Sequence, residues 1–450
     1  MTRRVAIVGS GPSGLFAAQA LLRGGDDVRV DVLDRLPTPF GLLRYGVAPD
    51  HVSIKAVADR LAAVFDDDRV RFFGMVELGT DVTRRELLDA YDAVVYAAGA
   101  SEDRRLAVPG EDLQGSVSAR EFVAWYSGHP DAHTQHLGGV TTAMCFGVGN
   151  VAVDVTRVLL AAPEQLSSTD MPQLVLDELA ASRVRHVWVV GRRGPQHASF
   201  TTPELRELLT LDDVAVDLNP AVFDGIDEAS LDRRTAGNIQ ALREASERVV
   251  ERPRATLHLL FWHRPIELVG EQRVRRVVLE RTEASEGTSV VGTGELREID
   301  VELVCKAIGY RGKALPGVPF DEAAGIIPNA DGRVVDAAGR VQPGEYVVGW
   351  IKRGPIGVIG TNKSDAAQTV ALLLEDLDAA PPRAHVELAD LMASRGRAPS
   401  TFDDWLAIDA AERDLGASLE RQRTKIESWH SLRDLVRGQR EGGPLEREIE

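Results

Sequence analysis

The most constraining feature of this 450-residue sequence is a glycine-rich turn close to its start. The apolar run at residues 5–8 predicts a buried strand, and apolar residues at helical spacing begin shortly after it. Between them, Gly9, Gly11 and Gly14 form the pattern G-x-G-x-x-G. Such glycines provide a tight turn, room for a pyrophosphate against bare backbone, and close packing of helix on strand. The sequence therefore predicts a dinucleotide-binding unit whose helix begins near Ser13, with the amino end of that helix facing the phosphates.

An acidic residue supports this interpretation. The second apolar run, residues 28–33, ends on Asp34. Dinucleotide-binding units place a carboxylate at about this spacing, where it accepts hydrogen bonds from a ribose 2′-hydroxyl. The alternative is a strand, turn and helix that bind no ligand, since glycine-rich turns are common.

The next segment, residues 36–51, is apolar but contains three prolines and two glycines. These residues exclude a regular helix or a central strand. We expect an apolar, proline-stiffened loop of this kind to be buried against something flat, and a flavin ring would serve.

A second dinucleotide-binding unit is predicted near residue 142. An apolar run leads into G-x-G-x-x-A, formed by Gly147, Gly149 and Ala152, and a helical pattern follows. The next predicted strand, residues 186–191, ends not on an acid but on two arginines, Arg192 and Arg193. Two guanidinium groups suit a 2′-phosphate, so the pattern favours NADP over NAD. The alternative is that both arginines are solvated surface residues.

Composition excludes several other classes of protein. A net charge of −17 argues against general nucleic-acid binding, which needs a basic surface. The only two cysteines, Cys145 and Cys305, cannot form a C-x-x-C redox pair or a cluster site. Both lie in apolar runs, so we expect buried, inert thiols and no metal site. No apolar run is long enough for a transmembrane helix. The first apolar run is interrupted by the glycine turn, so no targeting segment is predicted and a cytoplasmic protein is expected.

Taken together, these motifs resemble those of the adrenodoxin/ferredoxin–NADP reductase family, which are flavoproteins built on the two-dinucleotide plan of glutathione reductase. The resemblance extends over nearly all of the chain and rests on residues 38–42, 47–51, 150–154, 191–195, 204–207 and 349–359. It implies an α/β fold with two Rossmann-like domains. The FAD domain would be built from residues 1–103 and 315–450, ending in a charged helical tail. The NADP domain, residues 104–314, would be inserted between them.

The resemblance also implies which residues bind the cofactors. Those implied for FAD are Gly9, Gly11, Ser13, Gly14, Asp34, Leu42, Leu78, Trp350, Gly357, Val358 and Ile359. Those implied for NADP are Gly147, Val148, Gly149, Asn150, Val151, Arg192, Arg193 and Glu204. His51, Glu204 and Asp154 match polar residues that the family places near the flavin, and they are the candidate catalytic residues. Trp350 stands where related disulfide reductases have an aspartate that reaches FAD, which matches this family but not the wider class.

The activity that the resemblance implies is electron transfer from NADPH through FAD to a ferredoxin-type iron–sulfur protein. Hydride transfer from nicotinamide to flavin needs no protein nucleophile, because the cofactors supply the chemistry. His51 and Glu204 would position the nicotinamide or manage a proton at the flavin. The alternative for His51 is a helix-terminal residue satisfied by backbone. For Glu204 it is an acid favoured in the first turn of a helix.

Other functions remain open at this point. A diaphorase, a flavin monooxygenase or an amine oxidase is the rival enzyme, and the second glycine pattern with its two arginines counts against the last two. Thioredoxin reductase activity conflicts with the absence of C-x-x-C. A non-catalytic, reductase-like nucleotide-binding subunit is the remaining alternative. Because an acidic chain repels an acidic ferredoxin, we expect a locally basic docking face drawn from Arg206, Arg233, Arg234 and Arg243.

Overall fold

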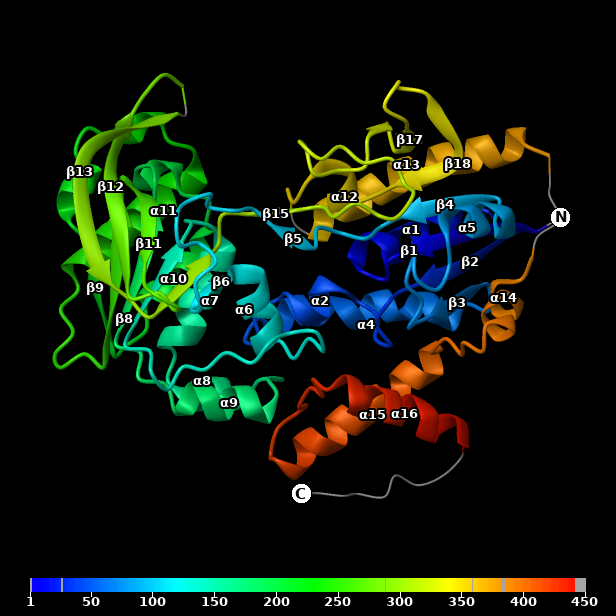
Figure 1. Cartoon of the computed structure of the whole chain (residues 1–450), viewed down its shortest axis with the longest axis horizontal. Coiled ribbons are helices and arrows are strands. Elements are labelled where there is room, and N and C mark those ends of the chain that lie inside the picture. The colour runs from blue at the N-terminus through cyan, green and yellow to red at the C-terminus, as the bar shows by residue number, and fades with distance from the viewer. Residues whose placement is uncertain (1, 26, 288, 358, 382–385, 442–450) are drawn as a thin grey trace. The chain divides into compact units, whose positions relative to one another are not determined.

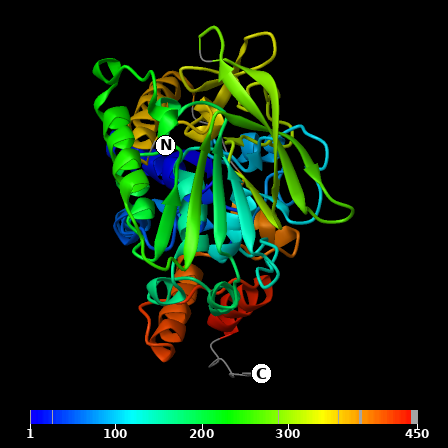
Figure 2. The same cartoon turned by 90° about the vertical axis from the view of Figure 1, so that its left-hand side faces the viewer.

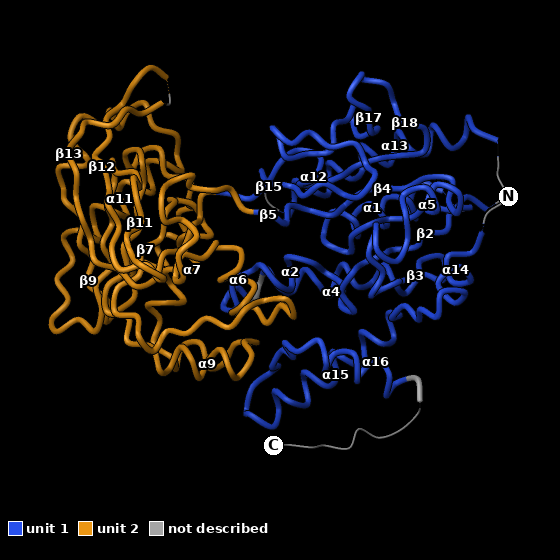
Figure 3. Tube along the Cα trace, in the orientation of Figure 1, with its two compact units in different colours: residues 1–102, 309–450 blue, residues 103–308 orange. Residues whose placement is uncertain are grey.

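The computed structural model describes residues 2–25, 27–287, 289–357, 359–381 and 386–441 (Figure 1). The chain divides into two compact units (Figure 3). The first unit contains residues 1–102 and 309–450, and the second contains residues 103–308. The domain boundaries expected from the sequence lie after residues 103 and 314, whereas the chain passes from one unit to the other after residues 102 and 308.

The first unit is built on a seven-stranded sheet. Five neighbouring strands run parallel, and two short antiparallel strands extend one edge. In spatial order they are β16 (Asn329–Ala330), β17 (Arg333–Val335), β18 (Val341–Val347), β4 (Ala93–Tyr96), β1 (Arg3–Val8), β2 (Val28–Leu33) and β3 (Val70–Phe73). Val5, at the centre of this sheet, pairs with Val30 on one side and Ala93 on the other. Runs of apolar residues form such central strands because both faces of a parallel sheet are buried.

Two long helices lie side by side on this sheet, α1 (Pro12–Gly24) and α13 (Ile359–Ala379). Their apolar residues share one hydrophobic core with the strands. The remaining helices before residue 400 are short: α2 (Leu42–Tyr45), α3 (Val52–Lys55), α4 (Val57–Ala62), η1 (Ala63–Asp66), α5 (Arg84–Ala90), α12 (Trp350–Arg353) and α14 (Leu388–Ser394). The prediction that residues 36–51 contain no helix is wrong for the one turn of α2, which fits between the prolines that flank it.

The C-terminal helices α15 (Phe402–Ser418) and α16 (Trp429–Glu441) belong to the core of the first unit. Trp405, Ile408 and Leu432 are at most 5% exposed and pack into the same hydrophobic cluster as α1 and α13. The charged tail predicted from the sequence therefore buries an apolar face against the unit.

The second unit contains a six-stranded, fully parallel sheet. Its order is β6 (Ser116–Ser118), β14 (Leu303–Lys306), β7 (Thr142–Phe146), β8 (His186–Gly191), β10 (Ala255–Phe261) and β9 (Val214–Asp217). The helices, which share a core with one face of this sheet, are α6 (Ala119–Tyr126), α7 (Asn150–Leu160), α8 (Pro163–Leu166), α9 (Gln173–Ala180), α10 (Thr202–Leu209) and α11 (Arg233–Glu247). Single turns occur at η2 (Pro195–His197), η3 (Pro220–Phe223) and η4 (Glu228–Ser230).

An antiparallel sheet packs on the other face of this parallel sheet. It consists of β11 (His263–Val269), β12 (Arg276–Ala284) and β13 (Val290–Asp300), and the β12–β13 hairpin is visible in Figure 2. Leu268, Val277 and Leu279 bury their side chains against Met144 and Phe146 of the parallel sheet. The sequence did not predict β13, because most of its side chains are polar and exposed. The short strands β5 (Glu102–Asp103) and β15 (Tyr310–Arg311) form a separate two-stranded sheet.

The two cysteines occupy neighbouring strands of the second unit. Cys145 on β7 and Cys305 on β14 lie in register, and both are buried free thiols, as predicted. Burial raises the pKa of the Cys145 thiol to about 12. Among the helices of the described ranges, none is long and apolar enough to cross a membrane. The same ranges contain no group of three or more His, Cys, Asp or Glu side chains that could hold a metal ion.

Candidate cofactor-binding sites

The turn after β1 has the backbone that its glycines predict. Gly9 has φ of 113°, and a Cβ atom there would lie 2.5 Å from the carbonyl oxygen of Ala97. A Cβ at Gly14 would lie 2.0 Å from the carbonyl oxygen of Gly9. At Gly11, by contrast, no atom of the described residues lies within 4 Å of the Cβ position. Two glycines are thus needed for the turn and the helix packing, and the third leaves open space beside bare backbone, as a pyrophosphate requires.

The amino end of α1 leaves its N–H groups open to a phosphate. The helix begins at Pro12, and its cap residue Gly11 provides no side-chain hydrogen bond to the first turn. A helix amino terminus without a side-chain cap carries unsatisfied donors and the positive end of the helix dipole. The geometry of this turn therefore fits a bound dinucleotide.

Asp34, predicted to bind the ribose, lies at the carboxyl end of β2 and is held by two neighbouring segments. Its Oδ2 atom accepts hydrogen bonds from the backbone N–H and the hydroxyl of Ser10, at 3.0 and 2.5 Å. Its Oδ1 atom accepts one from the backbone N–H of Leu36 at 3.0 Å. A carboxylate oxygen has two lone pairs, so Asp34 keeps acceptor capacity for a ribose hydroxyl while its direction is fixed by the protein.

Trp350 opens α12, next to the first glycine turn. Its neighbour Gly349 has φ of 77°, and a Cβ at Gly349 would lie 2.2 Å from the hydroxyl oxygen of Ser13. The backbone N–H of Gly349 donates to Asp365 Oδ2 at 2.7 Å, which fixes the start of this turn. The Trp350 Nε1 atom is buried, and no described residue accepts its hydrogen. An unsatisfied buried donor fits a site that a polar ligand atom completes.

The remaining residues predicted for FAD lie on several segments of the first unit. Leu42, on α2, is 36% exposed, whereas Leu78 is 8% exposed and packs its side chain into a hydrophobic cluster. Gly357, with φ of 91°, and Ile359 lie at the amino end of α13, and Val358 lies outside the described residues. His51 immediately precedes α3 and is half-buried, and its carbonyl oxygen accepts the N–H of Ile54 at 3.1 Å.

The turn after β7 repeats the geometry of the first turn in the second unit. Gly147 has φ of 127°, and a Cβ there would lie 2.2 Å from the carbonyl oxygen of Ala307. A Cβ at Gly149 would meet only the hydroxyl oxygen of Ser199, at 3.1 Å. Gly149 caps α7 without a side-chain hydrogen bond, and Ala152 is fully buried. This turn too leaves backbone N–H groups open to a phosphate.

A loop from before α10 fixes the residues of this second turn. Asn150 Oδ1 accepts the backbone N–H of Thr201 at 2.8 Å. The oxygen of the Asn150 amide is therefore used in a contact within the protein. The N–H of Ser199 donates to the carbonyl oxygen of Val148 at 2.8 Å. Val151, in the first turn of α7, is partly buried against the apolar core. Thr201 was not predicted from the sequence, and its hydroxyl is buried without a hydrogen-bond partner among the described residues.

Arg192 and Arg193 follow directly on the carboxyl end of β8, as predicted. Arg192 is exposed and Arg193 is half-buried, and neither guanidinium forms an ion pair with a carboxylate of the described ranges. Their backbone is held in place, because Thr282 donates its hydroxyl to the carbonyl oxygen of Arg192 at 2.8 Å. Two unpaired guanidiniums on a fixed strand end suit recognition of a phosphate.

The candidate catalytic acids of the second unit differ in their surroundings. Glu204 lies in the first turn of α10, and its Oε2 atom is buried without a hydrogen-bond donor among the described residues. Asp154 instead forms an ion pair with Arg157 at 3.0 Å, and Arg157 also faces Glu207 at 3.9 Å. Of these two acids, Glu204 is therefore the one with a buried carboxylate oxygen left to accept a hydrogen bond from a ligand. His51 belongs to the first unit.

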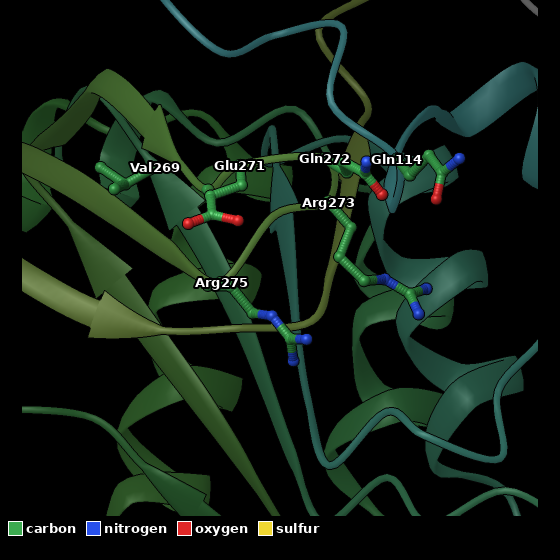
Figure 4. Close-up of a pocket in the computed structure, with 7 residues that line it drawn as sticks. Gln114, Val269, Glu271, Gln272, Arg273 and Arg275 are labelled. Carbon is green, nitrogen blue, oxygen red and sulfur yellow. The ribbon is translucent and has the colours of Figure 1, made fainter.

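A surface hollow of the second unit lies at the turn between β11 and β12 (Figure 4). Its lining residues are Gln114, Val269, Gly270, Glu271, Gln272, Arg273 and Arg275. Gln114 precedes the amino end of β6, whereas Gly147 follows the carboxyl end of β7. Since the strands are parallel, this hollow lies at the opposite edge of the sheet from the predicted NADP turn.

Comparisons with known proteins show similarity along nearly all of the chain. A family model described as "NAD(P)-binding Rossmann-like domain" matches residues 7–73. The chain is 44% identical to NADPH-ferredoxin reductase FprA of Mycobacterium tuberculosis, covering 95% of this chain and 98% of that protein. It is 40% identical to the mitochondrial NADPH:adrenodoxin oxidoreductase of Bos taurus, and the match covers 94% of this chain and 90% of that protein. The solved structure of Mycobacterium tuberculosis FprA in complex with NADPH superimposes with a TM-score of 0.91 at 43% identity, covering 97% of this chain and 99% of that one.

Proposed function

The chain belongs to the family of NADPH-ferredoxin and NADPH:adrenodoxin reductases, and we propose that it oxidises NADPH and passes the electrons, through FAD, to a ferredoxin-type iron–sulfur protein. The observation that carries this function is the pair of open glycine turns, one at Gly9–Gly14 and one at Gly147–Ala152, each after a strand of its own parallel sheet. Two dinucleotides bound in one chain are what a flavin-dependent NADPH oxidation requires. Bound FAD supplies the conversion between the two-electron donor NADPH and a one-electron acceptor.

In the first unit, we propose that the protein holds FAD with three sets of groups. The N–H groups at the amino end of α1 would bind its pyrophosphate, and Asp34 would accept a ribose hydroxyl. Trp350 would donate its buried indole N–H to a polar atom of FAD, which would satisfy the one hydrogen-bonding atom of that side chain. Gly357 and Ile359, at the amino end of α13, would offer backbone to the same cofactor.

In the second unit, we propose that the amino end of α7 binds the pyrophosphate of NADP and that Arg192 and Arg193 bind its 2′-phosphate. The unpaired guanidiniums support this assignment. Glu204 would orient the nicotinamide with its unsatisfied Oε2 atom. We assign Asp154 no chemical step, because Arg157 neutralises its carboxylate. His51 would hold or move a proton on the flavin side.

The rival functions lack a comparable observation. An amine oxidase takes its electrons from its substrate and has no use for a second nucleotide turn, and a monooxygenase does not explain the 40–44% identity to ferredoxin and adrenodoxin reductases. A non-catalytic nucleotide-binding subunit would use the same buried groups, Trp350 Nε1 and Glu204 Oε2, so turnover of NADPH is what separates it from a reductase. We also propose a cytoplasmic location, because two free thiols and NADPH as reductant fit a reducing compartment.

A coupled assay tests the proposed function. The purified protein is mixed with NADPH and cytochrome c, with and without a bacterial-type ferredoxin. Rapid cytochrome c reduction that depends on the ferredoxin supports the proposal. Oxidation of NADPH that the ferredoxin does not accelerate would identify a diaphorase instead, and no oxidation at all would favour the non-catalytic alternative.

A further inference from the structure

A strained corner of the 36–51 segment lies directly against the first glycine turn. Phe40 has φ of 82° and Gly41 has φ of 49°. The N–H of Phe40 donates to the carbonyl oxygen of Ser10 at 3.0 Å, and a Cβ at Gly41 would lie 3.1 Å from the Cα of Gly11. A bulky residue adopts positive φ only where the surrounding structure holds it there. The shape of the turn that faces the pyrophosphate therefore depends on whatever holds this corner.

The corner is held by a buried ion pair from the C-terminal part of the chain. Arg44, on α2, donates from Nη1 to Glu412 Oε2 at 3.1 Å and also from Nη2 to Glu412 Oε1. The side chain of Arg44 is 5% exposed and that of Glu412 is fully buried. Glu412 also pairs with Arg423 at 2.8 Å, and Lys425 donates to the carbonyl oxygen of Arg44 at 2.7 Å.

Aromatic contacts connect the same two segments. The rings of Phe40 and Trp405 meet edge to face, with centroids 5.7 Å apart. The Arg44 guanidinium lies 4.9 Å from the ring centroids of both Tyr45 and Trp405. Helix α15, which carries Trp405 and Glu412, thus contacts both the corner and the arginine behind it. Burying an ion pair contributes little net stability, so a charge cluster at this depth is better explained by the geometry that it fixes.

We propose that α15 is a brace for the FAD-binding turn and that Glu412 is a positioning residue, acting on Gly11 through Arg44 and the Phe40–Gly41 corner. This assigns a role in FAD binding to the C-terminal helices, and it rests on the proposed function of the first unit. The brace lies entirely within that unit, so its loss weakens FAD binding and leaves nucleotide binding by the second unit intact.

The test replaces Glu412 by Gln, which keeps the size of the side chain but removes the charge. The matched control is Asp376→Asn on α13, where Asp376 also binds an arginine, Arg333, through two hydrogen bonds at 2.7 and 2.8 Å. FAD binding to each apoprotein is measured by quenching of flavin fluorescence, and binding of 2′,5′-ADP by calorimetry. We expect Glu412→Gln to raise the Kd for FAD at least about tenfold, with Kd for 2′,5′-ADP unchanged. Asp376→Asn leaves both values unchanged.

Four outcomes decide the proposal. A folded Glu412→Gln protein with the wild-type Kd for FAD overturns the brace, and so does an equal effect in Asp376→Asn. If Glu412→Gln does not fold, Lys425→Met replaces it, since this change removes the contacts of Lys425 to the Arg44 carbonyl and the Tyr45 ring but keeps both partners of the Arg44–Glu412 ion pair. A raised Kd for FAD in that variant supports the brace, and an unchanged Kd overturns it. A wild-type protein that takes up no FAD overturns the proposed function itself, whereas the other outcomes leave that function standing.

Discussion

Ser10 donates two hydrogen bonds to Asp34, from its backbone N–H at 3.0 Å and from its hydroxyl at 2.5 Å. The contact joins the middle of the first glycine turn to the carboxyl end of β2. The carboxylate that we expect to receive the ribose of FAD is therefore fixed in direction by the protein alone. Preorganisation of this kind improves affinity because less freedom is lost when the ligand binds.

Replacing Ser10 by Ala removes the hydroxyl contact and keeps the backbone one. A hydrogen bond to a charged group contributes about 1.5–3 kcal/mol, and the surviving N–H contact compensates in part. We therefore expect the Kd for FAD to rise roughly three- to tenfold, measured by flavin fluorescence. Ser116→Ala, which removes a hydroxyl contact to the Glu111 carbonyl in the second unit, is the control and leaves FAD affinity unchanged. Equal FAD affinity in wild type and Ser10→Ala would show that the hydroxyl contact has no part in binding.

The second prediction concerns the choice of nicotinamide cofactor. Replacing Arg192 and Arg193 together by Ala removes two charge-assisted contacts, each worth about 1–3 kcal/mol, to the 2′-phosphate. We expect KM for NADPH to rise at least about a hundredfold. Steady-state kinetics with NADH barely change, since NADH has no such phosphate. Arg206→Ala is the control. The same loss with both cofactors would mean that the two arginines maintain the fold rather than bind phosphate.

The third prediction concerns docking of the ferredoxin. Arg243 forms an ion pair with Glu228 at 2.7 Å and lies 4.5 Å from the ring of Phe223, so it is already neutralised. Arg206 and Arg233 are exposed and have no ion pair among the described residues. We expect the double change Arg206→Glu and Arg233→Glu to slow ferredoxin reduction severalfold at low salt and to flatten its dependence on ionic strength. Such steering is screened within about 8–10 Å at ordinary salt.

Two controls accompany this experiment. Reduction of the uncharged acceptor menadione remains at the wild-type rate, because it needs no electrostatic docking. Arg243→Gln, which breaks the existing ion pair, leaves ferredoxin reduction unchanged. If the double variant keeps its flavin and reduces ferredoxin normally at low salt, the docking face lies elsewhere.

The fourth prediction concerns acid stability. Glu111 is buried, and although burial alone raises the pKa of its carboxyl, the backbone N–H groups of Leu106 and Ala107 and the charge of Lys306 lower it overall. The unfolded carboxyl titrates near about 4.3. As the pH falls through this value, the Glu111 carboxyl takes up a proton more readily in the unfolded chain than in the folded protein. The stabilisation that Glu111 provides is therefore fully present above this pH and is lost as the pH falls below it.

Glu111→Gln should lower the free energy of unfolding at neutral pH by about 1–3 kcal/mol, because a buried charged acceptor is removed. The difference from wild type should shrink as the pH falls below about 4. Urea unfolding at several pH values measures this. If the difference in the free energy of unfolding between wild type and Glu111→Gln is the same at every pH, the pKa of Glu111 does not differ between the folded and the unfolded protein.

The sequence was sufficient where function depends on local backbone chemistry. Gly9, Gly14 and Gly147 have the positive φ or the close backbone contacts that their spacing predicts, because no other residue fits there. The positions of Arg192 and Arg193 could be predicted because they directly follow an apolar run that the sequence identifies as a strand. These features need only neighbouring residues to be recognised.

The parts that the sequence did not reveal depend on pairing between distant segments. Arg44 and Glu412 are 368 positions apart, and each reads as an ordinary charged residue of an amphipathic segment. Asp365, which accepts the N–H of Gly349, is likewise indistinguishable in the sequence from the other polar residues of its long helix. The strand β13 was missed because an exposed strand lacks the apolar alternation that reveals others.

An anaerobic titration of the purified protein with NADPH, followed by visible absorption, shows whether bound FAD accepts electrons from NADPH. We expect a yellow protein with a single, non-covalently held FAD. NADPH bleaches its absorption at stoichiometric amounts, NADH at the same concentration does so far more slowly, and added oxidised ferredoxin restores the colour. A folded protein that is colourless and takes up no FAD, or a bound flavin that NADPH does not bleach, would show that the protein is not an NADPH-dependent flavin reductase.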